Sequence, residues 1–230
     1  MRILEHLSPA VAAIKPYEPG RPIEEVAREL GLDPDSIIKL ASNESPLGPS
    51  PKAVSALRAA LDEVHRYPDG YAWELRQRLA SHLTVSPDQL IFGNGSNEVL
   101  ELVGHCFLGP GKAAVFSQYA FVVYKLVTVL FGARPIEVPA TPELGHDLAA
   151  MRAAITPETT VVFLCNPNNP TSTMVSPAAL EAFAASLPEG VLLVLDEAYH
   201  ELMMGAQTDA LAWVRAGRPV LVCRTFSKAY

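Results

Sequence analysis

Cysteine is scarce in this sequence, and positive charge is not concentrated in any one stretch. The three cysteines, Cys106, Cys165 and Cys223, lie far apart without a C-x-x-C pair, and an odd number does not suit a disulfide framework. Lysine and arginine together number 18 against 25 aspartates and glutamates, which gives a net charge of −7. We therefore expect reduced, buried cysteines in a cytoplasmic protein, with no metal site and no nucleic-acid partner.

Long apolar runs are missing as well. The most apolar window, residues 121–133, is interrupted by Lys125 and is too short to cross a bilayer. The N-terminus carries Glu5 and His6 where an export signal needs an unbroken apolar stretch. The sequence therefore predicts neither a membrane span nor an export signal.

What is present is the balance of a globular protein, with 49% hydrophobic and 19% charged residues in 230. We expect an N-terminal arm at residues 1–45, with one short helical stretch at 23–30, followed by a large domain at 46–230. Two amphipathic helices should open that domain as layers covering a sheet, the first capped by Ser50. Their apolar faces are Val54, Leu57, Leu61 and Val64, and then Ala72, Leu75, Leu79 and Leu83.

Further along, short apolar runs alternate with helical segments. The runs lack polar alternation, which is typical of strands buried on both faces. They are residues 90–92, 113–116, 161–164, 191–195 and 220–223, and the helices are expected at 97–108, about 120–130, and 177–187. This alternation predicts a three-layer α/β/α fold with a mostly parallel sheet, in which ligands bind beyond the carboxyl ends of the strands.

A compact polar segment follows each predicted strand. The segments read GNGSNE (93–98), SQY (117–119), CNPNNP (165–170), DEAY (196–199) and RTFSK (224–228). Taken singly, each has a simpler reading. These readings are a glycine turn for GNGSNE, a packed aromatic for Tyr119, a turn for Asn169, a helix cap for Asp196, a core residue for Tyr199 and a surface lysine for Lys228.

Taken together, the segments suit one ligand, pyridoxal 5′-phosphate. Its aldehyde needs a lysine amine, and its ring nitrogen stays protonated beside a buried carboxylate, a role that suits Asp196 after an apolar strand. Asn169 and Tyr199 can donate hydrogen bonds to its phenolic oxygen. A helix N-terminus favours its phosphate, and Gly95, Ser96 and Asn97 offer one.

The ordered motifs carry a resemblance that covers the chain from about Tyr17 to its last residue. GNGSNE, CNPNNPT, DEAY and RTFSKAY, preceded by LASNESPLGPSP and RYPDG, resemble the histidinol-phosphate aminotransferase family of fold type I pyridoxal-phosphate enzymes. The resemblance implies a homodimer with a shared active site. It also implies amino transfer between histidinol phosphate and 2-oxoglutarate in histidine biosynthesis.

The resemblance further implies a role for individual residues. Lys228 would attach the cofactor and move a proton, Asp196 would pair with the ring nitrogen, and Asn169 and Tyr199 would bind the phenolic oxygen. Tyr119 would stack on the ring. The phosphate would be held by Gly95, Ser96 and Asn97, by the hydroxyls of Thr225 and Ser227, and by Tyr67 of the other subunit. Tyr17 and Asn43 would lie near the substrate.

The sequence departs from the family pattern in two places and lacks one expected part. Ser172 replaces a glycine, so the loop carrying Asn169 is strained if that position needs a positive φ, and Ser45 interrupts an NENP motif. Arginines for the substrate carboxylate and for a second phosphate contact are not found. We therefore expect an incomplete copy without the small C-terminal domain, which folds poorly alone and holds the cofactor weakly.

Other functions stay open at this point. Aromatic amino acid aminotransferases and a related decarboxylase share nearly the same cofactor motifs. A module that binds the cofactor without turnover is a further alternative. A nicotinamide-dependent enzyme is disfavoured, because GNGSNE lacks the third glycine of that fingerprint and no acidic residue ends a following strand.

Overall fold

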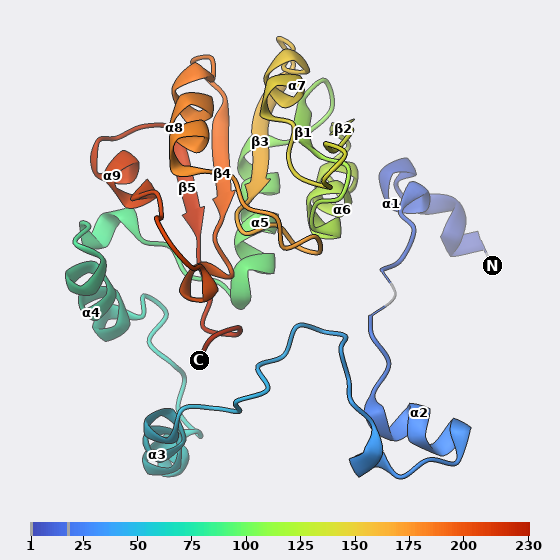
Figure 1. Ribbon diagram of the computed structural model, residues 1–230, viewed down its shortest axis with the longest axis vertical. Coiled ribbons are helices and arrows are strands. Elements are labelled where there is room, and N and C mark those ends of the chain that lie inside the picture. The colour runs from blue at the N-terminus through green and yellow to red at the C-terminus, as the bar shows by residue number, and fades with distance from the viewer. Residues whose placement is uncertain (1, 18) are drawn as a thin grey trace.

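The computed structural model describes residues 2–17 and 19–230, and its centre is a five-stranded parallel sheet (Figure 1). The strands are β1 (Ala113–Ser117), β2 (Arg134–Val138), β3 (Thr159–Cys165), β4 (Leu192–Asp196) and β5 (Val220–Cys223). Their order is β2-β1-β3-β4-β5, and every neighbouring pair is parallel. The predicted α/β class with a parallel sheet is confirmed.

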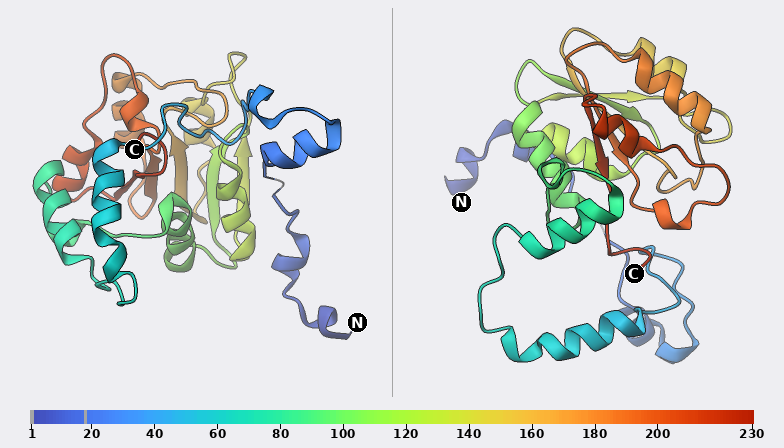
Figure 2. Two further views of the ribbon diagram at one scale, coloured as in Figure 1. Left: turned by 90° about the horizontal axis from the view of Figure 1, so that it is seen from below. Right: turned by 90° about the vertical axis from the view of Figure 1, so that its left-hand side faces the viewer.

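Helices cover both faces of the sheet, which gives three layers (Figure 2). On one face, Leu100 and Tyr124 pack against Phe163, and on the other, Leu180 and Trp213 pack in a second buried cluster. The helices are α1 (Pro9–Ala13), α2 (Ile23–Leu30), α3 (Pro51–Ala60), α4 (Trp73–Leu83), α5 (Gly95–Phe107), α6 (Val122–Leu130), α7 (Leu148–Ala153), α8 (Pro177–Ser186) and α9 (Ala210–Arg215). Among the described residues, no helix is long and apolar enough to cross a membrane.

The two edges of the sheet differ in character. β2 reads RPIEV, and its proline and charged residues are typical of an edge strand that is protected from further pairing. The sequence analysis missed β2 because these residues interrupt the apolar pattern. β5 reads VLVC, and Val220, Leu221 and Val222 are only half-buried. This edge therefore carries neither a charge nor a proline.

The predicted strand at residues 90–92 is wrong. Leu90 has the extended angles φ −110° and ψ 135°, but Ile91 is 56% exposed and no described strand pairs with this segment. A strand exists only when its backbone groups find a neighbouring strand. The other predicted strands, and the helices between them, differ from the structure by at most two residues at each end.

The N-terminal part packs less than the sequence predicts. α2 matches the expected helical stretch, and α3 begins at Pro51 after Ser50, although the side chain of Ser50 makes no capping bond within the described part. No residue of α3 is buried, and Leu57 is 67% exposed. In Figures 1 and 2, α2 and α3 lie away from the sheet. The prediction that α3 covers the sheet is therefore wrong, because Leu57, Leu61 and Val64 of its apolar face are exposed. The boundary between arm and domain at residues 45 and 46 stays a prediction.

Candidate functional site

Asp196 lies at the carboxyl edge of the sheet, on the strand next to the edge strand β5. It is the last residue of β4, it is 2% exposed, and in register it lies between Cys165 of β3 and Cys223 of β5. Its Oδ1 accepts a hydrogen bond from the backbone N–H of Ala198 at 3.0 Å, and its Oδ2 accepts one from the hydroxyl of Tyr124 at 2.7 Å. Burial raises the pKa of the Asp196 carboxyl, and the two hydrogen bonds oppose this rise.

Polar side chains from four distant segments meet in the same region. The Nδ2 of Asn43 donates to the hydroxyl of Tyr199 at 2.9 Å and lies 3.5 Å from Oδ1 of Asn169. The Nζ of Lys228 lies 5.8 Å from the centre of the Tyr199 ring. Burial raises the pKa of Tyr199, the Asn43 hydrogen bond lowers it, and the nearby Asp196 raises it further. The structure thus brings together five residues that the sequence analysis singled out.

The loop that follows β3 is hydrogen-bonded to the loop that follows β1 and carries Tyr119. Asn168, which is 3% exposed, donates from Nδ2 to the backbone oxygen of Tyr119 and to Oγ1 of Thr171, both at 2.8 Å. Tyr119 itself is 43% exposed. Ser172 adopts φ +58°, so this position does take the left-handed conformation that favours glycine, and the loop carrying Asn169 is strained as anticipated.

The first turn of α5 has the geometry of an anion site. Gly95 begins the helix with φ +72°, a conformation that glycine adopts without strain, and Ser96 is half-buried behind it. The N–H groups of a first helical turn have no partner within the helix. Oε2 of Glu98 accepts from the backbone N–H of Asn94 at 2.5 Å and from its Nδ2 at 3.1 Å, which fixes the entry to the turn. Asn97 is exposed.

The turn that carries Lys228 also carries two of the predicted phosphate ligands. Oγ1 of Thr225 and Oγ of Ser227 lie 2.8 Å apart, and the backbone N–H of Ser227 donates to Oγ1 of Thr225 at 3.2 Å. Lys228 is half-buried directly after them. The sequence spacing of these three residues therefore places two hydroxyls and an amine in one short turn.

The structure does not bring every predicted residue into this region. Tyr67 is fully exposed, and within the described residues it makes no hydrogen bond to any predicted site residue. Tyr17 is 59% exposed and lines a pocket of about 190 Å³ together with Asn97, at the side of α5 and α6. It therefore lies apart from the group around Asn43.

An ion pair beside Asp196 was missed by the sequence analysis. Oε2 of Glu197, a residue 2% exposed, accepts from Nε of Arg224 at 2.9 Å and lies 2.8 Å from its Nη2, so the pair joins the ends of β4 and β5. Burial raises the pKa of Glu197, and Arg224 opposes this rise. Nδ1 of His200 lies 3.4 Å from Oε2 of Glu197, and burial and the charge of Arg224 lower the pKa of His200. The signal was available, because both charged residues directly follow apolar strands.

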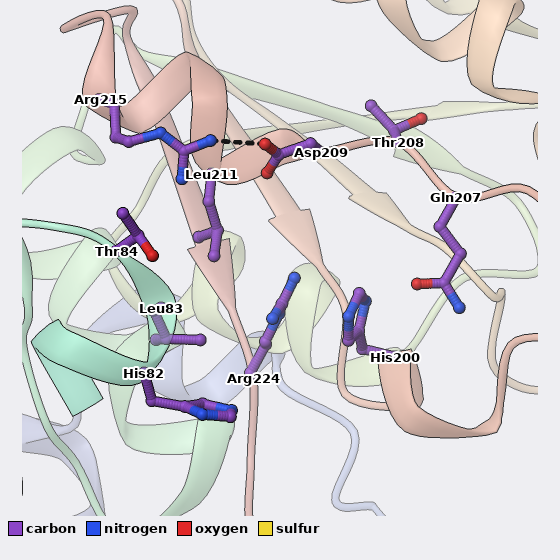
Figure 3. Close-up of a pocket in the computed structure, with 10 residues that line it drawn as sticks. All are labelled: His82, Leu83, Thr84, His200, Gln207, Thr208, Asp209, Leu211, Arg215 and Arg224. Carbon is purple, nitrogen blue, oxygen red and sulfur yellow. Dashed lines mark hydrogen bonds and ion pairs between the residues drawn. The ribbon is translucent and has the colours of Figure 1, made fainter. Parts of the chain in front are cut away.

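Arg224 also lines a pocket of about 630 Å³ (Figure 3). Its walls come from the end of α4, the segment before α9, and the residues His200 and Arg224, and it includes the ion pair between Arg215 and Asp209 at 2.5 Å. None of the predicted site residues lines it. Within the described part of the chain, no group of three or more His, Cys, Asp or Glu residues is placed to hold a metal ion.

Comparison with known sequences gives consistent results. The model of the family described as aminotransferase class I and II matches residues 35–230. A histidinol-phosphate aminotransferase of Methylobacillus flagellatus is 51% identical over 230 residues, which is 100% of this chain and 62% of that protein. Histidinol-phosphate aminotransferase 2 of Pseudomonas fluorescens (strain Pf0-1) is 54% identical over 223 residues, covering 96% and 60%. The chain thus spans about 60% of the length of these relatives.

Solved structures of similar fold point the same way. A crystal structure of histidinol-phosphate aminotransferase from Sinorhizobium meliloti in complex with pyridoxal 5′-phosphate has a TM-score of 0.86 at 30% identity, covering 98% of this chain and 60% of that one. Aspartate aminotransferase from Thermus thermophilus with maleate has a TM-score of 0.82 at 27% identity, covering 97% and 61%.

Proposed function

Because this chain belongs to the class I and II aminotransferase family, we propose that it provides the cofactor site of a pyridoxal-phosphate-dependent aminotransferase. The observation that carries this proposal is the buried Asp196 at the carboxyl edge of the sheet, with Asn43, Asn169, Tyr199 and Lys228 gathered near it. The pyridine ring of the cofactor, when bound, accepts electrons from the bond that breaks. The residues in place fit its functional groups.

Each side chain then has one task. Asp196 holds a proton at the ring nitrogen, because its buried carboxylate favours a positive charge beside it. Asn169 and Tyr199 orient the phenolic oxygen, and Tyr119 covers the ring. The amine of Lys228 would hold the cofactor through its aldehyde and, when free, would carry a proton on Nζ. The phosphate ligands are Gly95, Ser96 and Asn97 at the start of α5, together with Thr225 and Ser227 beside Lys228.

We propose histidinol phosphate as the amino donor and 2-oxoglutarate as the acceptor. The support is the identity of 51% and 54%, over nearly the whole chain, to relatives that bear the name of that enzyme. Asn43 would then lie near the substrate, whereas Tyr17 lies apart from it in the same subunit, and the exposed Tyr67 would reach the phosphate site of a second subunit in a homodimer.

The test is a transamination assay with three donors, namely histidinol phosphate, phenylalanine and aspartate. It is run on residues 1–230 and on the same chain extended by any coding sequence that follows Tyr230. We expect histidinol phosphate to be the preferred donor. A preference for phenylalanine would refute the assignment of histidinol phosphate as the substrate. Asp196→Asn should lower turnover by on the order of 10², whereas the control Asp88→Asn, at an exposed position, should not. Near-normal turnover in Asp196→Asn would show that another group holds the ring proton.

A further inference from the structure

Tyr124 is a buried polar residue that the proposed chemistry does not use directly. It lies fully buried in the apolar helix α6, and its hydroxyl donates to Oδ2 of Asp196 at 2.7 Å. Its ring stacks on Phe163 with centroids 4.8 Å apart and planes 2° apart, and the edge of Phe121 meets it at 5.9 Å. The ring is therefore clamped on two sides, and the direction of the hydroxyl is fixed.

The other groups that face Asp196 are weak competitors for this hydrogen bond. Cys165 and Cys223 flank it on the neighbouring strands, and burial raises the pKa of Cys165 to about 12 and that of Cys223 well above its ordinary value. Both thiols stay protonated at neutral pH. Glu197, the next residue in the chain, is occupied by Arg224.

The phenol of Tyr124 is a donor at every physiological pH. Burial, and then the charge of Asp196, raise its pKa well above the ordinary value. The carboxylate thus receives two strong hydrogen bonds, one from this phenol and one from the backbone N–H of Ala198. A substitution at position 198 leaves its backbone N–H in place. A substitution at position 124 can remove the hydroxyl, so this is the hydrogen bond that a mutation can test.

We propose that Tyr124 is a positioning residue, whose hydroxyl fixes the rotamer of Asp196 and keeps its carboxylate ionised in a buried setting. Its importance for catalysis rests on the proposed function. Its effect on Asp196 does not, because both residues belong to this chain. A hydrogen bond to the charged form of an acid stabilises that form, so the loss of one of two donors favours the protonated acid. A protonated Asp196 no longer offers a negative charge to a cationic ring nitrogen.

The primary test compares Tyr124→Phe with Thr128→Val, in the expressed chain without added cofactor. Thr128 is a matched control, because it is fully buried on the same helix and its hydroxyl donates to the backbone oxygen of Tyr124, at 2.6 Å, and to no other group in the described part of the chain. The carboxyl of Asp196 is followed by ¹³C NMR as a function of pH, with the resonance assigned from Asp196→Asn. We expect the pKa of Asp196 to rise in Tyr124→Phe and to stay unchanged in Thr128→Val.

A second measurement covers the case in which Tyr124→Phe does not fold. With 3-fluorotyrosine in place of all seven tyrosines, the ¹⁹F resonance of Tyr124 should shift as Asp196 titrates, and this shift should vanish in Asp196→Asn. With pyridoxal phosphate added, the pH dependence of the cofactor absorbance should move in Tyr124→Phe only. An unchanged titration of Asp196 in Tyr124→Phe, or an equal change in Thr128→Val, overturns the proposal. With the NMR result intact, failure to bind the cofactor even in the chain extended beyond Tyr230 would instead refute the proposed function.

Discussion

Neutralising Glu197 should destabilise the protein far more than neutralising an exposed glutamate. The Glu197 side chain is 3% exposed and that of Arg224 23%, so Glu197→Gln leaves a largely buried guanidinium without a countercharge. Breaking such a pair from one side costs about 3 to 5 kcal/mol. Since Arg224 keeps some contact with water and the glutamine oxygen still accepts one hydrogen bond, we expect about 2 to 3 kcal/mol. The control Glu74→Gln breaks an exposed pair with Arg78 and should cost under about 0.5 kcal/mol.

Urea unfolding followed by circular dichroism measures both losses. With a slope of about 2 kcal/mol per molar urea, Glu197→Gln should lower the midpoint by about 1 M or more, without a change in the slope. A double-mutant cycle with Arg224→Met should give a coupling energy of more than about 1 kcal/mol, because the two side chains are in direct contact. Equal midpoints for Glu197→Gln and Glu74→Gln, or additive losses in the cycle, would refute the idea that this pair ties β4 to the turn carrying Lys228.

Three further experiments test other parts of the protein. Borohydride reduction of the protein loaded with pyridoxal phosphate, followed by peptide mass mapping, should place the adduct on Lys228, and an adduct on another lysine would contradict the assignment. Ser172→Gly should raise the free energy of unfolding in urea by about 1 kcal/mol, because it relieves a non-glycine residue at φ +58°; an unchanged midpoint would show that the loop carries no strain. Burial lowers the pKa of His146 below its ordinary 6.5, so the unfolded chain takes up this proton first as the pH falls. The free energy of unfolding should therefore decrease as the pH is lowered below about 6.5, and a titration by circular dichroism should show a flatter profile in His146→Asn.

The sequence predicted the parts of the site that follow directly from strand ends. Asp196, Asn169 and Lys228 each lie at or just beyond the carboxyl end of an apolar strand, and in a parallel sheet those ends meet at one edge. The sequence also marked Ser172 as a position of strain if it took a positive φ, because a serine stands where the related motif has glycine, and the structure gives φ +58° there. In each case a local pattern in the chain carried the information.

What the sequence did not predict depends on contacts between distant segments. Tyr124 reads as one more large residue of an apolar helix, and only the packing of α6 on the sheet brings its hydroxyl to Asp196. The bond from Asn43 to Tyr199 spans 156 positions. For α3 the sequence predicted a contact that the structure lacks. The apolar periodicity correctly indicates a helix, but it says nothing about whether a partner surface is present.

The contrast between the two sheet edges has a practical consequence for anyone who handles the protein. A β-strand with unpaired backbone groups and apolar side chains is a template for another strand, and β5, unlike β2, contains neither a proline nor a charged residue that would hinder such pairing. We expect two copies of residues 1–230 to join edge to edge along VLVC. Concentrated samples of this chain should therefore scatter light and precipitate, through the same backbone groups that make the interior of the sheet rigid.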